Sequence, residues 1–221
     1  MKSIIAFLII FATAVLAGMW LLSDAESKRD LPVYSPVDVN PDLVDPSIQN
    51  KGNYHTISNF YLQNQDGIWV DKSILKGKIA VVNYFFATCP TICPLMNGKV
   101  ANVYEKFKGT GKVIFLSHTV MPEVDSAAAL KEYAQIYGAE TKSWMFLTGD
   151  KAHLYELARK SYLIAPDMND PDYTHGSEND FIHTENIALI DTKGQIRGFY
   201  DGTIDKDMKQ LEEDIQLLLD Q

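Results

Sequence analysis

Two near-continuous apolar runs, each followed by a segment with helical spacing, limit the folds open to this chain. The runs KIAVVNYFF (78–86) and KVIFLSHTV (112–120) lack the alternation of a half-exposed strand, which is typical of strands buried on both faces of a sheet. Residues 95–108 and 126–138, which follow them, repeat apolar side chains at helical spacing. Strands buried on both faces need helices on both sides, so the pattern predicts an α/β fold.

The rest of the chain continues this pattern. Residues 57–75 hold strand-like runs on either side of NQDG, which predicts a β-hairpin, and residues 186–203 predict a second hairpin about DTKG. A further strand and helix are expected at 144–150 and 151–162, and an amphipathic helix at 205–220. We therefore expect a central mixed sheet flanked by helices.

The overall charge restricts the partners. Of the 221 residues, 46% are hydrophobic and 22% are charged, as in ordinary globular proteins, and the net charge is −9. Nucleic acids and anionic lipid headgroups attract clustered lysine and arginine side chains. The negative charge therefore argues against both as partners.

The N-terminus predicts attachment to a membrane. One lysine, Lys2, precedes twenty uncharged and mostly apolar residues, Ser3–Leu22, a run long enough to cross a bilayer as a helix. The run also resembles a signal peptide cleaved before Gly18, but it continues beyond that site. No cysteine lies near it, which excludes a bacterial lipoprotein. We expect residues 1–22 to be an uncleaved single-pass anchor in a bacterial inner membrane, with the domain on the periplasmic side and a signal sequence as the alternative.

The segment after the anchor differs from both its neighbours. Residues 23–53 contain four prolines and many Asp, Asn and Ser residues, and each proline biases its predecessor toward extended backbone. This composition predicts a semi-extended tether. The folded domain is then expected to comprise residues 54–221.

The chain contains only two cysteines, Cys89 and Cys93, and each is followed by a proline. They come after a predicted buried strand, where the next helix begins, and backbone N–H groups at a helix N-terminus favour thiolate. A separation of four residues places both on one face if the segment is helical. A structural disulfide would close a tiny loop and remove little entropy from the unfolded chain. Two inert core cysteines are the other alternative, but a proline-flanked turn is not a core pattern. The pair is therefore interpreted as reactive.

The motifs together resemble the Sco/SenC family of copper chaperones. The resemblance rests on the NQDG hairpin, the buried strand, TCPTICP (88–94) and DFIHTENIALID (180–191), and it covers the chain from about Ile57 onward. It implies a thioredoxin-like fold with an added β-hairpin and a membrane anchor. It also implies that two thiolates and one imidazole bind copper, and that the protein helps to build the copper site of cytochrome c oxidase. Matched residue by residue, the implied ligands are Cys89, Cys93 and His183.

The residues alone leave the choice of histidine open. His183 directly precedes a predicted strand, and His118 ends a buried strand near the same sheet edge as the cysteines. The sequence context disfavours the other three: His153 lies among charged residues of a helix, His175 lies in an acidic loop, and His55 lies ahead of the first predicted strand.

Two thiolates and one imidazole form a soft, three-ligand set. Thiolates select Cu(I) and Zn(II), and imidazole also accommodates Cu(II). A structural zinc site usually has a fourth protein ligand, whereas an open coordination position suits a carrier. A disulfide between the cysteines would remove both thiolates, so loading would depend on redox state. The expected partners are the copper-site subunit of cytochrome c oxidase and a thioredoxin-like reductant.

The main alternative is a thiol–disulfide oxidoreductase that keeps the recipient's copper-site cysteines reduced, since two neighbouring thiols can attack a disulfide. Oxidoreductases of this fold usually have two residues between their cysteines rather than three, which favours a non-enzymatic carrier. One departure from the family concerns the residue before Pro122. The family typically has an acid there and this chain has Met121, so the chain either uses Glu123, Asp125 or His118 instead or does without such a partner.

Overall fold

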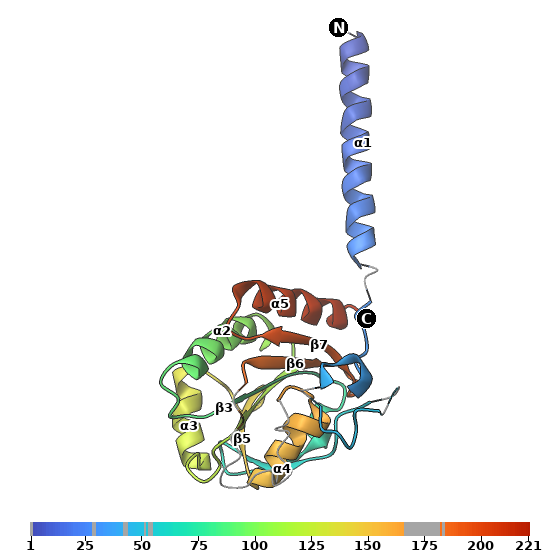
Figure 1. The fold of residues 1–221 in the computed structure, drawn as a ribbon. Coiled ribbons are helices and arrows are strands. Elements are labelled where there is room, and N and C mark those ends of the chain that lie inside the picture. The colour runs from blue at the N-terminus through green and yellow to red at the C-terminus, as the bar shows by residue number, and fades with distance from the viewer. Residues whose placement is uncertain are drawn as a thin grey trace. The chain divides into compact units, whose positions relative to one another are not determined.

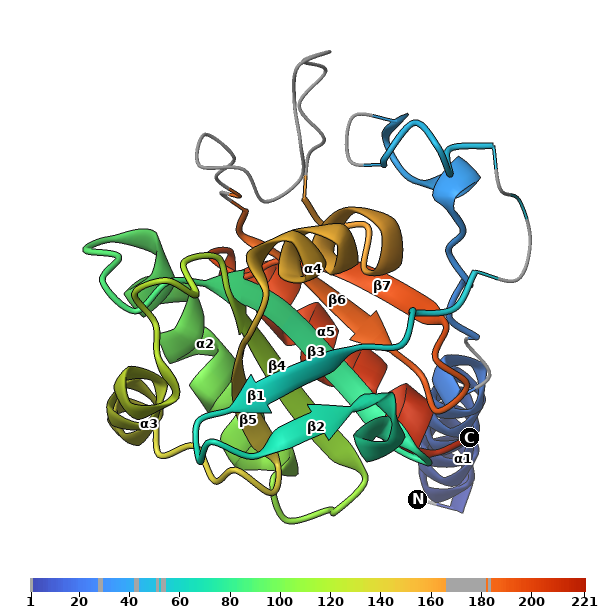
Figure 2. The same ribbon diagram turned by 90° about the horizontal axis from the view of Figure 1, so that it is seen from below.

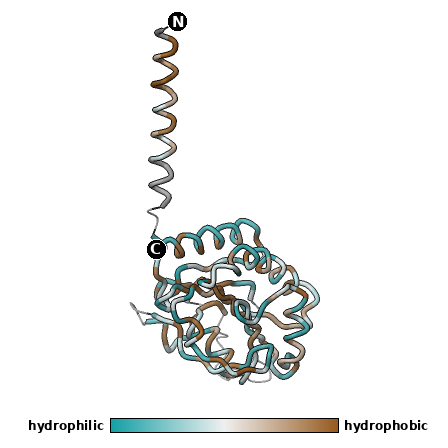
Figure 3. The backbone as a smooth tube through the Cα atoms, turned by 180° about the vertical axis from the view of Figure 1, so that it is seen from behind, coloured by the Kyte–Doolittle hydropathy of each residue, from teal (hydrophilic) through white to brown (hydrophobic). Residues whose placement is uncertain are grey.

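The computed structural model of the protein describes residues 2–27, 30–41, 44–50, 52, 55–165, 182 and 184–221. It divides into two compact units, Met1–Leu31 and Pro32–Gln221. The first contains helix α1, Lys2–Ser27, whose described residues are largely apolar (Figure 3). Almost all of their described side chains are exposed. Among the described residues, no helix combines the length and the apolar character needed to cross a membrane.

The second unit alternates strands and helices. Its strands are β1 (Tyr61–Asn64), β2 (Trp69–Asp71), β3 (Ile79–Phe85), β4 (Val113–Thr119), β5 (Trp144–Thr148), β6 (Asn186–Ile190) and β7 (Ile196–Asp201). Its α-helices are α2 (Ile92–Phe107), α3 (Ala127–Ile136), α4 (Lys151–Glu156) and α5 (Asp205–Leu219). Short helical turns are η1 (Pro36–Asp38), η3 (Lys72–Leu75) and the π-helical η4 (Leu157–Ser161).

These elements confirm the two predicted hairpins and the repeated strand–helix pattern. Helix α2 begins at Ile92, three residues earlier than expected, because Pro94 is tolerated in the first turn, where its missing N–H has no helical acceptor. The hydroxyl of Ser126 caps α3 by accepting the N–H of Ala129 at 3.3 Å. The helix predicted after β5 is confirmed at its start, but it continues beyond α4 as the π-helical turn η4.

The seven strands form one mixed sheet in the order β2-β1-β5-β4-β3-β6-β7. Strand β4 pairs in parallel with β3 and β5, and the other neighbours are antiparallel. All seven residues of β3 are buried, as its continuous apolar pattern predicts. The predicted α/β class with a central mixed sheet flanked by helices is confirmed.

Helices cover both faces of this sheet. Helices α2, α3 and α5 lie on one face and α4 lies on the other (Figures 1 and 2). Side chains along β3 alternate accordingly. Asn83 faces α2, where its Nδ2 donates to Asn97 Oδ1 at 2.9 Å, and Tyr84 faces α4, where its hydroxyl donates to the Leu154 carbonyl at 2.8 Å. The loop after β3 is therefore held between two packed layers.

Part of the proline-rich segment packs against the sheet. The N–H of Tyr34 donates to the carbonyl of Ile196 in β7 at 2.9 Å, which makes an isolated antiparallel bridge. Arg197 Nε donates to the carbonyl of Pro32 at 3.1 Å, and the side chain of Val44 is fully buried in the core. The compact unit therefore includes described residues from Pro32 onward.

Candidate metal and thiol site

The two cysteines lie where β3 ends and the chain turns into α2. The N–H of Cys89 donates to the carbonyl of Phe86 at 3.2 Å, and Cys93 is the second residue of α2. The N–H of Cys93 donates to Cys89 Sγ at 3.5 Å, and the two side chains hydrogen-bond to each other. Both thiols are free and buried, with 7% and 4% of the residue surface exposed. Cys89 lies just outside the helix, but the loop returns it to the helix start.

The surroundings of the two thiols shift their pKa values in opposite directions. For Cys89, burial raises the pKa, but the N–H groups of Cys93, Thr91 and Ile92 and the Cys93 thiol outweigh burial, so the pKa is lowered. For Cys93, burial is the largest effect and raises the pKa to about 12, against a hydrogen bond from the Phe86 backbone. Cys89 is thus the thiol that ionises first.

Asp125 holds the loop that carries Cys89. This carboxylate is 1% exposed, accepts the N–H of Ala87 at 3.1 Å and also accepts the hydroxyl of Thr119 at the end of β4. Its negative charge contributes to the raised pKa of Cys93. Asp125 therefore ties the cysteine loop to the neighbouring strand.

Neither Met121, which stands in place of the missing acid, nor Glu123, another candidate replacement, hydrogen-bonds to the cysteine loop among the described residues. The N–H of Met121 donates to Thr119 Oγ1 at 2.9 Å, and the Met121 side chain packs, partly buried, against the core. Glu123 forms an exposed ion pair with Lys151 at 3.6 Å. Of the three acids and bases that the sequence left open, Asp125 is the one that hydrogen-bonds to the cysteine loop.

A buried polar network holds α2 on the sheet behind the cysteines. Asn97, fully buried on α2, accepts from Asn83 Nδ2 and donates through its own Nδ2 to the hydroxyl of Tyr133 at 3.1 Å. Asn83 Oδ1 in turn accepts the hydroxyl of Ser117 in β4 at 2.7 Å. These bonds link β3 and β4 to α2 and α3, so they set the position of the helix that carries Cys93.

The third predicted ligand, His183, lies outside the described residues, as does His175. Its described neighbours Ile182 and Thr184 both line a narrow hollow that Cys93 also lines. The hydroxyl of Thr184 donates to the carbonyl of Ile164 at 2.8 Å. The chain therefore comes close to Cys93 at residues 182 and 184.

His118, the competing histidine, packs on the opposite face of the sheet from α2. It is fully buried, and its ring stacks on Tyr84 with a centroid distance of 5.0 Å and contacts Tyr162 at 5.2 Å. Burial lowers its pKa to about 3, and its Nδ1 has no hydrogen-bond partner among the described residues. His118 is a core residue in this arrangement.

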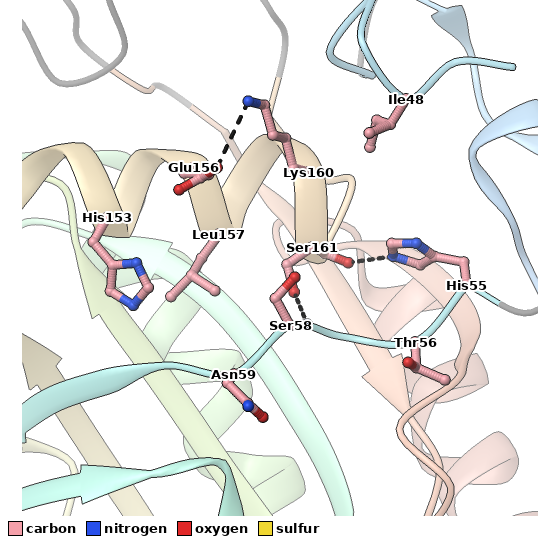
Figure 4. A pocket seen from close by; sticks show the side chains of 10 residues that line it. All are labelled: Ile48, His55, Thr56, Ser58, Asn59, His153, Glu156, Leu157, Lys160 and Ser161. Carbon is pink, nitrogen blue, oxygen red and sulfur yellow. Dashed lines mark hydrogen bonds and ion pairs between the residues drawn. The ribbon is translucent and has the colours of Figure 1, made fainter. Parts of the chain in front are cut away.

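Two further histidines share a separate cavity of about 340 Å³, which sequence reasoning missed. His55 and His153 both line it, and His55 Nε2 donates to the carbonyl of Ser161 at 2.7 Å (Figure 4). Lys160 at its rim pairs with Glu156 at 3.6 Å. No thiol lines this cavity. Only the folding of the segment before β1 against α4 and η4 creates it, so no motif in the sequence signals it.

Within the part of the chain that the structure describes, no group of three or more His, Cys, Asp and Glu side chains is arranged to hold a metal ion. The described residues supply two soft sulfur donors, Cys89 and Cys93, side by side at the end of β3. Two thiolates fit Cu(I), Zn(II) or, with a nitrogen donor, Cu(II).

Comparisons with known proteins agree with this arrangement. A model of the SCO1/SenC family matches residues 48–220. The SCO1 protein homolog of Bacillus subtilis (strain 168) is 31% identical over 157 residues, which cover 70% of this chain and 78% of that protein.

Solved structures share the fold. BsSco, described as a member of the Sco family of cytochrome c oxidase assembly proteins with a disulfide switch, has a TM-score of 0.61 at 27% identity. The match covers 76% of this chain and 96% of that one. Bradyrhizobium japonicum ScoI with copper bound has a TM-score of 0.57 at 24% identity over 74% of this chain and 99% of that one, a likeness of fold.

Proposed function

Because the chain belongs to the SCO1/SenC family, we propose that it carries copper and helps to assemble the copper site of a cytochrome c oxidase. The observation that carries the proposal is the pair of free, neighbouring thiols at the end of β3, with residues 182 and 184 lining the same hollow as Cys93. Copper is the cargo here. Cys89, Cys93 and His183 are its proposed ligands.

The chemistry of these groups supports a carrier. Both thiols must lose their protons to bind metal, and the lowered pKa of Cys89 makes it the first donor available to an incoming ion. Cys93, with its pKa near 12, releases its proton as the metal binds. Oxidation to a disulfide blocks both donors, so a thioredoxin-like reductant is part of the proposal.

Copper titration of the reduced protein without oxygen tests the ligand set. We expect one copper per chain, and bound Cu(II) should show thiolate-to-metal charge-transfer absorption that Cys89→Ser/Cys93→Ser lacks. His183→Ala should weaken copper binding at least about tenfold to a hundredfold, the range typical even of residues behind the ligands. His118→Phe and His153→Ala are the matched controls and should bind copper normally. Unchanged affinity in His183→Ala would refute that ligand.

A second candidate function is thiol–disulfide exchange with the recipient's cysteines. The different pKa values of the two thiols favour this function. A thiol of lowered pKa attacks a disulfide, and its neighbour then releases the mixed disulfide that forms. The variant His183→Ala separates the two functions. A carrier loses copper transfer in this variant and keeps its titratable thiols, whereas an oxidoreductase keeps its turnover on a peptide that carries the recipient's two cysteines.

We also propose that residues 3–22 attach the protein to a bacterial inner membrane, with the compact unit on the periplasmic side. The uncharged run and the exposed apolar side chains of α1 support this attachment. Full-length protein should stay with membranes after a carbonate wash. A soluble mature chain beginning near Gly18 would instead identify a signal peptide.

A further inference from the structure

Four lysines at one edge of the sheet differ from most other lysines of the chain. Eight described lysines form ion pairs with carboxylates: Lys99, Lys106, Lys108, Lys131, Lys142, Lys151, Lys160 and Lys209. Lys76, Lys78, Lys112 and Lys193, here called the lysine edge, form no ion pair with any described residue. Their charges are therefore available to an outside anion.

The fold gathers these lysines although they are far apart in sequence. Lys78 and Lys112 directly precede the parallel strands β3 and β4, and the N–H of Ile79 donates to the Lys112 carbonyl at 2.9 Å. Lys193 lies in the β6–β7 turn, and it lines a cavity of about 350 Å³ together with Lys112 and Gly77. Gly77 lies between Lys76 and Lys78, so all four lysines lie at or beside this cavity.

The side-chain carboxylate at the cavity is already paired. Asp191 is the only side-chain carboxylate among the lining residues, and it pairs with Arg197 at 3.0 Å, with both side chains 7% exposed. The other oxygen of Asp191 accepts the N–H groups of Lys193 and Gln195, each at 2.9 Å. The lysine edge is thus a local excess of positive charge on a protein of net charge −9.

The chain enters the compact unit beside this edge. Arg197, which lines the cavity, donates to the carbonyl of Pro32, the first residue of the unit. Pro32 follows Leu22, where the proposed bilayer segment ends, by ten residues. The five helical residues up to Ser27 add about 8 Å, and the next five span at most about 18 Å when extended. With residues 3–22 in a bilayer, as proposed above, the lysine edge is restricted to the neighbourhood of the lipid headgroups.

We infer that the lysine edge binds the phosphate groups of anionic phospholipids, with the thiols facing away from that surface. Strand β3 (Figure 2) runs from Ile79, which follows Lys78, to Phe85, which precedes the loop of Cys89, and its seven residues span about 20 Å. This inference rests on the proposed membrane attachment. It revises the expectation from net charge, because an average over the chain conceals a cluster that only the fold assembles.

The test uses the full-length protein in vesicles of phosphatidylcholine, with and without phosphatidylglycerol. The rate of acetylation at each lysine is measured by mass spectrometry of peptides. With phosphatidylglycerol, acetylation at Lys76, Lys112 and Lys193 should slow severalfold, and high salt should abolish the difference. Lys142 and Lys209, whose side chains are 76% and 77% exposed, should react equally in both vesicles.

Variants and a soluble anion complete the test. In Lys112→Gln/Lys193→Gln the protection remaining at Lys76 should be lost, whereas the matched control Lys142→Gln/Lys209→Gln should keep it. Equal rates in both vesicles overturn the inference and leave the copper proposal intact. Equal protection by inorganic phosphate in phosphatidylcholine vesicles overturns the lipid assignment. Release of the protein by a carbonate wash overturns the membrane attachment and this inference with it.

Discussion

Cys89 and Cys93 are neighbouring thiols whose pKa values are shifted in opposite directions. Three backbone N–H groups stabilise the Cys89 thiolate, whereas burial and nearby negative charge disfavour the Cys93 thiolate. With a pKa near 12, about one Cys93 in ten thousand is ionised near pH 8. Iodoacetamide should therefore modify Cys89 first in the reduced protein, with peptide mass spectrometry as the readout.

Single-cysteine variants provide the control for this prediction. In Cys93→Ser the backbone N–H of residue 93 remains, so Cys89 should keep most of its reactivity. In Cys89→Ser the remaining Cys93 should react slowly at the same pH. Equal alkylation rates for the two cysteines in the native protein would contradict the assignment of Cys89 as the more acidic thiol.

His118 makes stability depend on pH. Its pKa in the fold is about 3, because burial disfavours the charged ring, whereas an unfolded histidine has a pKa near 6.5. Between these values the unfolded chain binds a proton that the folded chain does not. The stability that comes from keeping His118 neutral is therefore fully present above about pH 6.5. As the pH falls toward 3, the free energy of unfolding decreases by at most about 1.4 kcal/mol per pH unit.

The variant His118→Phe should remove this part of the pH dependence. Urea unfolding at about pH 7 and about pH 5 measures it, with the native protein as reference. The aromatic ring should keep the stacking on Tyr84, and the substitution removes a buried nitrogen that has no partner among the described residues. A variant whose stability falls with pH as steeply as the native protein would show that another group is responsible.

The sequence predicted the residues of the site more easily than the hydrogen bonds and packing between them. The cysteines stood out because the chain has only two. Asp125 was only one of three candidate replacements for the missing acid, because its bonds to Ala87 and Thr119 join segments that only the fold brings together. The sequence also could not separate His118 from His183, since one residue of strand register decides which face of the sheet a side chain takes. His183 itself remains a prediction.

At the scale of elements, the hydrogen bond between Asn83 and Asn97 holds α2 against the sheet. Asn97→Ala should lower the free energy of unfolding by about 3 kcal/mol, because Asn83 and Tyr133 lose a buried partner. Denaturation in urea measures the change. Gln63→Ala, which removes an exposed bond to the carbonyl of Gly67, is the control and should change stability by less than about 0.5 kcal/mol. A comparable loss in both variants would argue against the network.

The elements differ in how well their patterns predicted them. Strands β3 and β4 were clear because buried parallel strands have continuous apolar runs. The π-helical turn η4 was not, since Leu157–Ser161 has ordinary helical composition, which does not distinguish a π-helical turn from an α-helix. The packed residues after Pro32 were also unexpected, because a composition rich in proline and aspartate is typical of linkers and does not report a single bridge such as Tyr34 to Ile196.

Across the compact unit, the two ends of the sheet carry different chemistry. The thiols lie at the C-terminal end of β3, and the lysine edge lies at its N-terminal end. The proposed copper donors and the proposed lipid contact therefore occupy opposite ends of one rigid strand. Substitutions at the lysine edge should leave copper affinity unchanged.

The effect of the Tyr34 bridge on aggregation can be tested by removing the backbone N–H of residue 34. Tyr34→Pro loses the N–H that donates to Ile196, whereas Tyr34→Ala loses only the ring contact with Phe199 and keeps the N–H. On mild heating, light scattering should rise faster in Tyr34→Pro than in Tyr34→Ala. The same rate in both variants would show that the main-chain bond has no such effect.

The bridge between Tyr34 and Ile196 affects the tendency of this protein to aggregate. Strand β7 is the last of the sheet, and the outer side of an edge strand is a template on which a strand of another molecule can pair. The opposite edge, β2, is only three residues long and offers little template. The segment that begins at Pro32 covers part of the outer edge of β7, so it blocks strand pairing there and opposes edge-to-edge aggregation. This matters most where many copies are crowded onto a surface.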